Sequence, residues 1–285
     1  MPSNIALFGR TCAELAICGL SVSPSLGIFA TMNLKRIVMS NDDGIHAPGI
    51  RTFHDAIKDL AEIEVVAPSD EQSAVGHSIT IFDPIKTRKV SRDGEDFGLA
   101  VGGTPADCVK LAICELCDEP PDMVVSGINL GPNIGISVLY SGTVSAATEA
   151  TILGIPSIAV SLCTYFEPQW ETAATVARRI VEKALASDLP PNTLLNVNIP
   201  NLPIGDIKGT RVAPIARSRF KEMFHKRTDP RGNLYYWLDG ELEMLENDKE
   251  TDVGFLWDGY VTITPINFDL TDYDALASFD DWTAV

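Results

Sequence analysis

Short apolar runs alternate with longer amphipathic stretches from residue 34 to about residue 200. A short β-favouring run bounded by turn residues is typical of a buried strand, whereas apolar residues three and four positions apart are typical of one helix face. The alternation predicts an α/β fold, a three-layer, Rossmann-like and mostly parallel sheet with helices on both faces. The predicted strands are 36–40, 64–68, 99–101, 122–125, 158–162 and 194–198, and the predicted helices begin near residues 50, 104, 143 and 170.

The pattern changes after residue 200. Residues 211–214 and 220–237 have the composition of extended chain, with a turn containing proline and glycine at 229–233, and they predict a C-terminal β-hairpin appendage. Residues 261–265 alternate as a further strand. The hairpin could be a subunit contact, in a homodimer or a homotetramer, or could fold back on the protein's own core, and the sequence leaves both open. Its aromatic residues are Phe220, Phe224, Tyr235, Tyr236 and Trp237.

The first 33 residues do not continue the pattern. Glu14 and several serines interrupt their apolar stretch, which therefore lacks the clean centre of a signal peptide and the roughly 18 uninterrupted apolar residues of a membrane span. Met32 lies just before the first predicted strand. We therefore interpret residues 1–33 as a dispensable N-terminal extension. Residues 34–285 are expected to form one domain, with a core over about 34–200 and the appendage over about 201–285.

The chain is acidic, with a net charge of −17. It therefore lacks a broad basic face for a nucleic acid polymer, and a small phosphorylated substrate would need a local cation or a helix N-terminus to balance its charge. The six cysteines mostly lie in apolar stretches, and Cys114 and Cys117 have no second pair at zinc spacing. We interpret the cysteines as buried hydrophobic residues of a cytoplasmic protein without a membrane partner, in preference to a redox or zinc module.

Small polar residues follow several of the predicted strands. Asp42 and Asp43 follow the first strand, Ser73 lies in the segment after the second, and Asn129 lies after the fourth. In an open parallel sheet, ligands bind in the crevice at the carboxyl ends of the strands. Carboxylate, hydroxyl and amide oxygens suit Mg²⁺ or Mn²⁺, although an Asp-Asp-Gly sequence is more commonly a solvated turn. The helix that begins near residue 143 would offer backbone N–H groups to a phosphate.

Six segments of the chain resemble the signatures of the SurE (survival protein E) nucleotidase family. They match in order over about residues 34–200, and residues 259–265 resemble the closing strand of that family. The differences are the extension before Met32 and small replacements such as Pro132. The matching segments are Ser40–Gly49, Val66–Ser73, Gly103–Val109, Pro121–Gly131, Tyr140–Val144 and Gly154–Ala159.

The resemblance implies an enzyme, a metal-dependent 5'-nucleotidase that hydrolyses nucleoside 5'- and 3'-monophosphates, with short polyphosphate as a further substrate. Asp42 and Asp43 are then both candidate catalytic residues. Asp42 is the candidate general base or water-positioning group and Asp43 the candidate for the firmer metal ligand, although the sequence does not separate these two roles. The resemblance implies one divalent cation, Mg²⁺ or Mn²⁺, with the ligands Asp42, Asp43, Ser73 and Asn129, and phosphate contacts from Asn133, Ser141, Gly142 and Thr143.

Other interpretations of the same crevice remain open. A nucleotide-binding sensor would use it without turnover. An aspartyl-phosphate phosphatase would use a strand-end aspartate as its nucleophile, although that class usually separates its two aspartates by one residue. Thr104 and Asp107, by contrast, require no catalytic role, because a threonine before proline and an aspartate in the first turn are typical of a helix cap.

Overall fold

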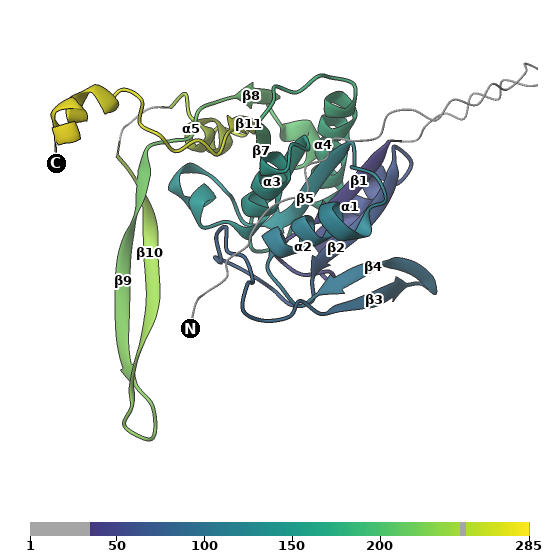
Figure 1. The fold of residues 1–285 in the computed structure, drawn as a ribbon, viewed down its shortest axis with the longest axis horizontal. Coiled ribbons are helices and arrows are strands. Elements are labelled where there is room, and N and C mark those ends of the chain that lie inside the picture. The colour runs from purple at the N-terminus through teal and green to yellow at the C-terminus, as the bar shows by residue number, and fades with distance from the viewer. Residues whose placement is uncertain (1–34, 246–248, 285) are drawn as a thin grey trace, which may run out of the picture. The chain divides into compact units, whose positions relative to one another are not determined.

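The computed structural model describes residues 35–245 and 249–284 (Figure 1). The predicted extension over residues 1–33 therefore lies outside the described residues. In the described chain, nine strands form one sheet in the order β3-β4-β2-β1-β5-β6-β7-β11-β8. These strands are β1 (Arg36–Ser40), β2 (Glu62–Pro68), β3 (Thr87–Arg92), β4 (Glu95–Val101), β5 (Met123–Leu130), β6 (Ser157–Cys163), β7 (Leu194–Pro200), β8 (Thr210–Val212) and β11 (Val261–Ile266).

The inner part of the sheet is parallel. Strands β4, β2, β1, β5, β6 and β7 pair side by side in one direction, whereas β3 is antiparallel to β4 and β11 is antiparallel to β7. From β1 the chain moves outward through β2 to β3 and β4, and then returns to place β5 on the other side of β1. The order reverses between β1 and β5, and ligands of open α/β sheets bind at such a switch point.

Helices cover both faces of the sheet. Because successive side chains of a strand point to opposite faces, Ile37 and Met39 of β1 pack with α1 and α4, and Val38 packs with α2 and α3. The predicted three-layer α/β fold is thus confirmed. The helices are α1 (Pro48–Ile57), α2 (Pro105–Leu111), α3 (Gly142–Ile152), α4 (Trp170–Leu185) and α5 (Asp252–Trp257), with short helical turns at Ala112–Leu116, Gly135–Leu139, Ile204–Asp206 and Leu276–Ala284. None of the described helices has the length and hydropathy needed to cross a membrane.

Two parts of the sheet differ from the predicted pattern. Strand β3 has no counterpart in the prediction, because its sequence is mostly polar and Val90 is its buried residue. Strand β5 continues past residue 125 to Leu130, since residues 129 and 130 still pair with β6 after a shift in register that follows Ser126. Asn129 therefore lies near the end of β5, and its predicted place after the strand is wrong.

Strands β9 (Ser218–Thr228) and β10 (Leu234–Met244) form the predicted hairpin as a separate two-stranded sheet. Residues 211 and 212, which were predicted as part of the hairpin, instead belong to β8 of the nine-stranded sheet. The carboxylate of Asp229 holds the turn by accepting the N–H groups of Arg231 and Asn233, each at 2.8 Å. Figure 1 shows the hairpin as a long arm whose tip lies away from the nine-stranded sheet. Trp237 is 65% exposed and Phe224 is 64% exposed. The alternative in which the hairpin folds back on its own core is therefore wrong for the single chain.

The described cysteines are free thiols in different surroundings. Cys108 is buried as expected, whereas Cys114 is exposed and does not fit the interpretation as a buried residue. Cys117 donates its thiol to Glu64 at 3.2 Å. Burial and that carboxylate raise the pKa of Cys117 to about 12, so little reactive thiolate exists at neutral pH. A redox role for the Cys114–Cys117 pair has no support in this geometry.

Candidate active site

The ends of β1, β2 and β5 meet at the switch point of the sheet. Because β1 lies between β2 and β5, the residues after β1 have the segment after β2 on one side and the end of β5 on the other. Backbone hydrogen bonds join these segments. The N–H of Gln72 donates to the carbonyl of Asp42 at 2.7 Å, and the N–H of Ile45 donates to the carbonyl of Pro68 at 2.9 Å. The segment after β2 is thereby held beside the two aspartates that follow β1.

The Asp42 carboxylate is buried at the N-terminus of α3. Thr143 donates both its hydroxyl and its backbone N–H to this carboxylate. Burial raises the pKa of Asp42 above its usual value, and the two hydrogen bonds from Thr143 act in the opposite direction. Gly142 allows the close approach, because a Cβ at that position would lie 2.7 Å from the Cβ of Asp42. The first turn of α3 therefore fits closely around one carboxylate.

Asp43 is less buried than Asp42 and accepts a hydrogen bond from the backbone N–H of Leu130. Burial and the adjacent charge of Asp42 raise the pKa of Asp43 to about 7, and Glu71 adds to the effect. Two neighbouring carboxylates with raised pKa values repel each other once both are ionised. A bound cation would remove this repulsion, so the pair has the electrostatic character of a cation site.

Asn129 and Ser73 add neutral oxygen atoms from the two flanking segments. Asn129 is buried, and its side-chain nitrogen donates to the carbonyl of Gly131 at 2.8 Å, so its amide oxygen keeps its lone pairs as acceptors. The exposed Ser73 donates its hydroxyl hydrogen to Glu71 at 2.6 Å and keeps its oxygen lone pairs as acceptors. Both side chains thus keep an oxygen atom that can accept, and their role as metal ligands stays a prediction.

The donor set fits a hard divalent cation. Two carboxylates, one amide oxygen and one hydroxyl are the oxygen ligands that Mg²⁺ and Mn²⁺ prefer. No cluster of three or more histidine, cysteine, aspartate or glutamate side chains suited to a metal occurs among residues 35–245 and 249–284. A cation at this crevice would therefore depend on neutral oxygens as well as on the two aspartates.

Two of the predicted phosphate contacts have structural partners of their own. Ser141 caps α3, since its hydroxyl accepts a backbone N–H of the first turn at 3.1 Å. Asn133 is buried, and its side-chain nitrogen donates to Ser161 at 2.8 Å. The Asn133 carbonyl accepts from the side chains of Asn196 at 2.8 Å and Asn198 at 3.0 Å. The side-chain nitrogen of Asn133 thus faces β6, and its contact with a phosphate stays a prediction.

The residues that hold the loop after β5 were not among the candidates from the sequence. These residues are Ser161, Asn196 and Asn198. The available signal was a pair of asparagines two positions apart in a short apolar run at 194–198. Such a pair lies on one face of a strand, and a buried amide is costly unless it has hydrogen-bond partners. Glu149 gave a similar signal, as a charged residue within a helix of small side chains that is otherwise mostly buried.

Comparisons with known proteins agree with this arrangement. The family model described as survival protein SurE matches residues 37–222. The chain belongs to the SurE family. The 5'-nucleotidase SurE of Heliobacterium modesticaldum is 49% identical over 248 residues, which cover 87% of this chain and 91% of that protein. The 5'-nucleotidase SurE of Syntrophobacter fumaroxidans is 45% identical over 247 residues, with 87% and 99% covered.

A solved SurE structure has the same fold. The crystal structure of the SurE protein from Aquifex aeolicus aligns with a TM-score of 0.76 and 42% sequence identity, covering 87% of this chain and 99% of that one. The resemblance to the SurE family and the predicted fold class are thus both confirmed. The matched region, residues 37–222, includes every predicted site residue.

Proposed function

We propose that this SurE-family protein is a metal-dependent 5'-nucleotidase that hydrolyses nucleoside 5'- and 3'-monophosphates to nucleoside and phosphate. Short polyphosphate is a further proposed substrate. The similar proteins from H. modesticaldum and S. fumaroxidans carry the name 5'-nucleotidase. Within the molecule, the observation that carries the proposal is the pair Asp42 and Asp43 at the switch point of the sheet, with the N-terminus of α3 against Asp42.

The proposed cofactor is one divalent cation, Mg²⁺ or Mn²⁺. Its proposed ligands come from the three joined segments, with the firmest bond from the less buried Asp43. A cation of this kind supplies charge neutralisation for the phosphate and lowers the pKa of a bound water. The raised pKa of Asp43 supports this assignment, because the carboxylate form needs a positive partner at neutral pH. The four ligands are Asp42, Asp43, Ser73 and Asn129.

The N-terminus of α3 is the proposed phosphate site. Gly142 and Thr143 present backbone N–H groups at the positive end of the helix, where an anion is stabilised. The Thr143 donors are bound to Asp42 in the structure. We propose that a phosphate takes over these donors, which frees Asp42 to orient or deprotonate the attacking water. Ser141 and Asn133 are proposed to complete the phosphate contacts.

A substrate panel with and without metal tests the activity. Nucleoside 5'- and 3'-monophosphates, short polyphosphates and p-nitrophenyl phosphate would be assayed after chelation and after addition of Mg²⁺ or Mn²⁺. We expect hydrolysis that requires the metal, and we expect Asp43→Ala to abolish it while the protein stays folded. A protein that binds nucleotides but shows no turnover with any metal would instead be the nucleotide-binding sensor. A trapped phospho-enzyme would favour the aspartyl-phosphate mechanism.

We further propose a homodimer or a homotetramer in which the β9–β10 hairpin is a subunit contact. Its exposed aromatic side chains support this assignment, since monomers rarely expose a large apolar patch. Light scattering after size exclusion would show a smaller species for Trp237→Ser if the hairpin forms the contact. We also propose that the protein is cytoplasmic and has no nucleic acid polymer or membrane as a partner. Residues 34–285 are proposed as one domain, and full activity after deletion of residues 1–33 would support the dispensable extension.

A further inference from the structure

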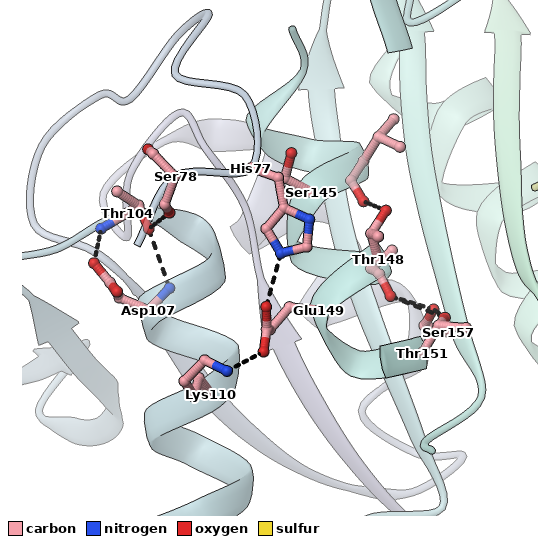
Figure 2. Close-up of polar contacts among 12 residues, drawn as sticks. His77, Ser78, Thr104, Asp107, Lys110, Ser145, Thr148, Glu149, Thr151 and Ser157 are labelled. Atoms are coloured by element: carbon pink, nitrogen blue, oxygen red, sulfur yellow. Dashed lines mark hydrogen bonds and ion pairs between the residues drawn. The ribbon is translucent and has the colours of Figure 1, made fainter. Parts of the chain in front are cut away.

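A cluster of charged side chains lies between α2, α3 and the segment 69–86, which links β2 to β3 (Figure 2). Glu149 of α3 lies at the centre of this cluster and is 3% exposed. One of its carboxylate oxygens bonds to Nε2 of His77 at 2.7 Å, and the other forms an ion pair with Lys110 of α2. Burial raises the pKa of Glu149, but the His77 and Lys110 contacts outweigh burial and bring the pKa below its usual value. Glu149 is therefore an ionised, buried carboxylate.

The segment that carries His77 also carries Ser73. It contains no helix or strand over residues 69–86, so its position depends on individual hydrogen bonds. The N–H of Gln72 donates to the carbonyl of Asp42 at 2.7 Å, and the N–H of Gly76 donates to the carbonyl of Tyr140 at 3.1 Å. Ser73 lies between the two donors Gln72 and Gly76, and His77 is the residue directly after Gly76. The contact of His77 with Glu149 thus fixes the position of the chain just after the turn that contains Ser73.

A second buried carboxylate holds the next part of the segment. Asp107 of α2 accepts the backbone N–H of Thr80 at 2.8 Å and the Thr80 hydroxyl at 2.6 Å, and the hydroxyl of Thr104 donates to the carbonyl of Ser78 at 2.7 Å. Asp107 and Thr104 also form the predicted helix cap, which is confirmed. The residues after His77 are therefore attached to α2, whereas His77 itself is attached to α3, the helix that also holds Asp42.

We propose that Glu149 and His77 are positioning residues for the cation site, and that they hold Ser73 at the crevice by fixing its segment to α3. The inference rests on the proposed function, in which Ser73 is a metal ligand. Helix α3 then controls two sides of the site. The first turn of α3 binds Asp42 through Thr143. About two turns later, Glu149 of α3 binds His77 and so holds the segment that carries Ser73. Loss of the anchor should weaken cation binding more than it slows turnover at saturating cation.

Direct measurement of Mn²⁺ binding tests the inference in the full-length protein. His77→Ala removes a half-exposed side chain, so the variant should fold. The electron paramagnetic resonance signal of free Mn²⁺ measures how tightly each protein binds the ion. We expect the dissociation constant to rise about five- to twentyfold, less than the full value of one charge-assisted hydrogen bond, because His77 acts through the segment and does not touch the cation itself. In Mn²⁺-activated hydrolysis, the half-activating concentration should rise by the same factor, with kcat at saturating Mn²⁺ within about twofold of wild type.

Two further variants separate positioning from general stability. Glu149→Gln keeps an oxygen that can accept from His77, so its loss of Mn²⁺ affinity should be smaller than that of His77→Ala. Arg178→Gln is the matched control, because it removes a half-exposed ion pair to Asp59 on the α1–α4 face of the sheet. We expect no change in Mn²⁺ affinity for this control.

Wild-type Mn²⁺ affinity in His77→Ala would overturn the inference while leaving the nucleotidase proposal intact. An equal loss of affinity in Arg178→Gln would overturn it as well, since the effect would then come from general destabilisation. If the wild-type protein itself bound no Mn²⁺ and hydrolysed no nucleotide, the proposed function would be wrong, and the inference would fail with it. These results are distinguishable, because the last is decided on the wild-type protein alone.

Discussion

Replacing Asp43 with asparagine should stabilise the metal-free protein at neutral and alkaline pH. Burial and the charge of Asp42 raise the pKa of Asp43 from 3.8 to about 7. Between these two values the unfolded chain releases the proton and the folded chain retains it, so the stability of the folded protein decreases as the pH rises. Above about pH 7 both states are ionised, and the cost of the buried charge is constant.

The pKa values give the size of the effect. At 1.36 kcal/mol per pKa unit, the difference between 3.8 and about 7 corresponds to roughly 4 kcal/mol of lost stability above pH 7. Asparagine removes that charge but accepts a weaker hydrogen bond from the Leu130 N–H, at a cost of about 1 kcal/mol. The net gain at pH 8 should be about 2–4 kcal/mol, equivalent to roughly 5–12 °C in melting temperature. At pH 4 the gain should vanish.

Thermal unfolding in a chelating buffer from pH 4 to pH 8.5 measures this difference for wild type and Asp43→Asn. Addition of Mn²⁺ should remove most of this difference. A saturating cation stabilises the wild type by about 2.7 kcal/mol at a concentration 100-fold above its dissociation constant, and the variant lacks one ligand. Equal melting temperatures at pH 8 without metal would refute the reasoning, and so would a gain that is as large at pH 4 as at pH 8.

Three other substitutions probe the surroundings of the aspartates. Gly142→Ala would place a methyl group 2.7 Å from the Cβ of Asp42, so we expect kcat/KM to fall at least about tenfold in steady-state assays. Thr143→Val removes the hydroxyl that Asp42 accepts and should raise the pKa of Asp42, which moves the pH of half-maximal Mn²⁺ binding upward. Asn198→Ala leaves the buried N–H and carbonyl of Asn133 without this partner and should cost about 1–3 kcal/mol in urea unfolding.

The first two of these variants have a neutral or conservative counterpart. Gly205→Ala adds a methyl group where no atom lies within 4 Å and should keep full activity. Thr143→Ser retains the hydroxyl and should keep the wild-type pH dependence of Mn²⁺ binding. Full activity in Gly142→Ala would mean that catalysis does not depend on the close contact between α3 and Asp42. An unchanged urea midpoint for Asn198→Ala would show that water replaces the lost amide.

Much of the architecture could be predicted from local pattern alone. The apolar run at β1 and the spacing along α1 and α4 identify their elements, because buried strands and amphipathic helices have different periods. The cap formed by Thr104 and Asp107 is likewise local, since both partners lie within one turn. Asp42 and Asp43 could be found for the same reason, as consecutive residues at the end of a strand in a sheet that binds ligands at that edge.

The sequence by itself therefore determined the layers of the fold, the strand that ends in two aspartates and the family to which the chain is similar. Only the tertiary structure decided that Thr143 holds Asp42, that Asn133 is bound by two asparagines of β7, and that Glu149 anchors the segment carrying Ser73. Each of these contacts joins residues that are tens of positions apart or more. Periodicity and capping act within a few residues, whereas a buried polar group finds its partner only after the sheet and its helices have packed.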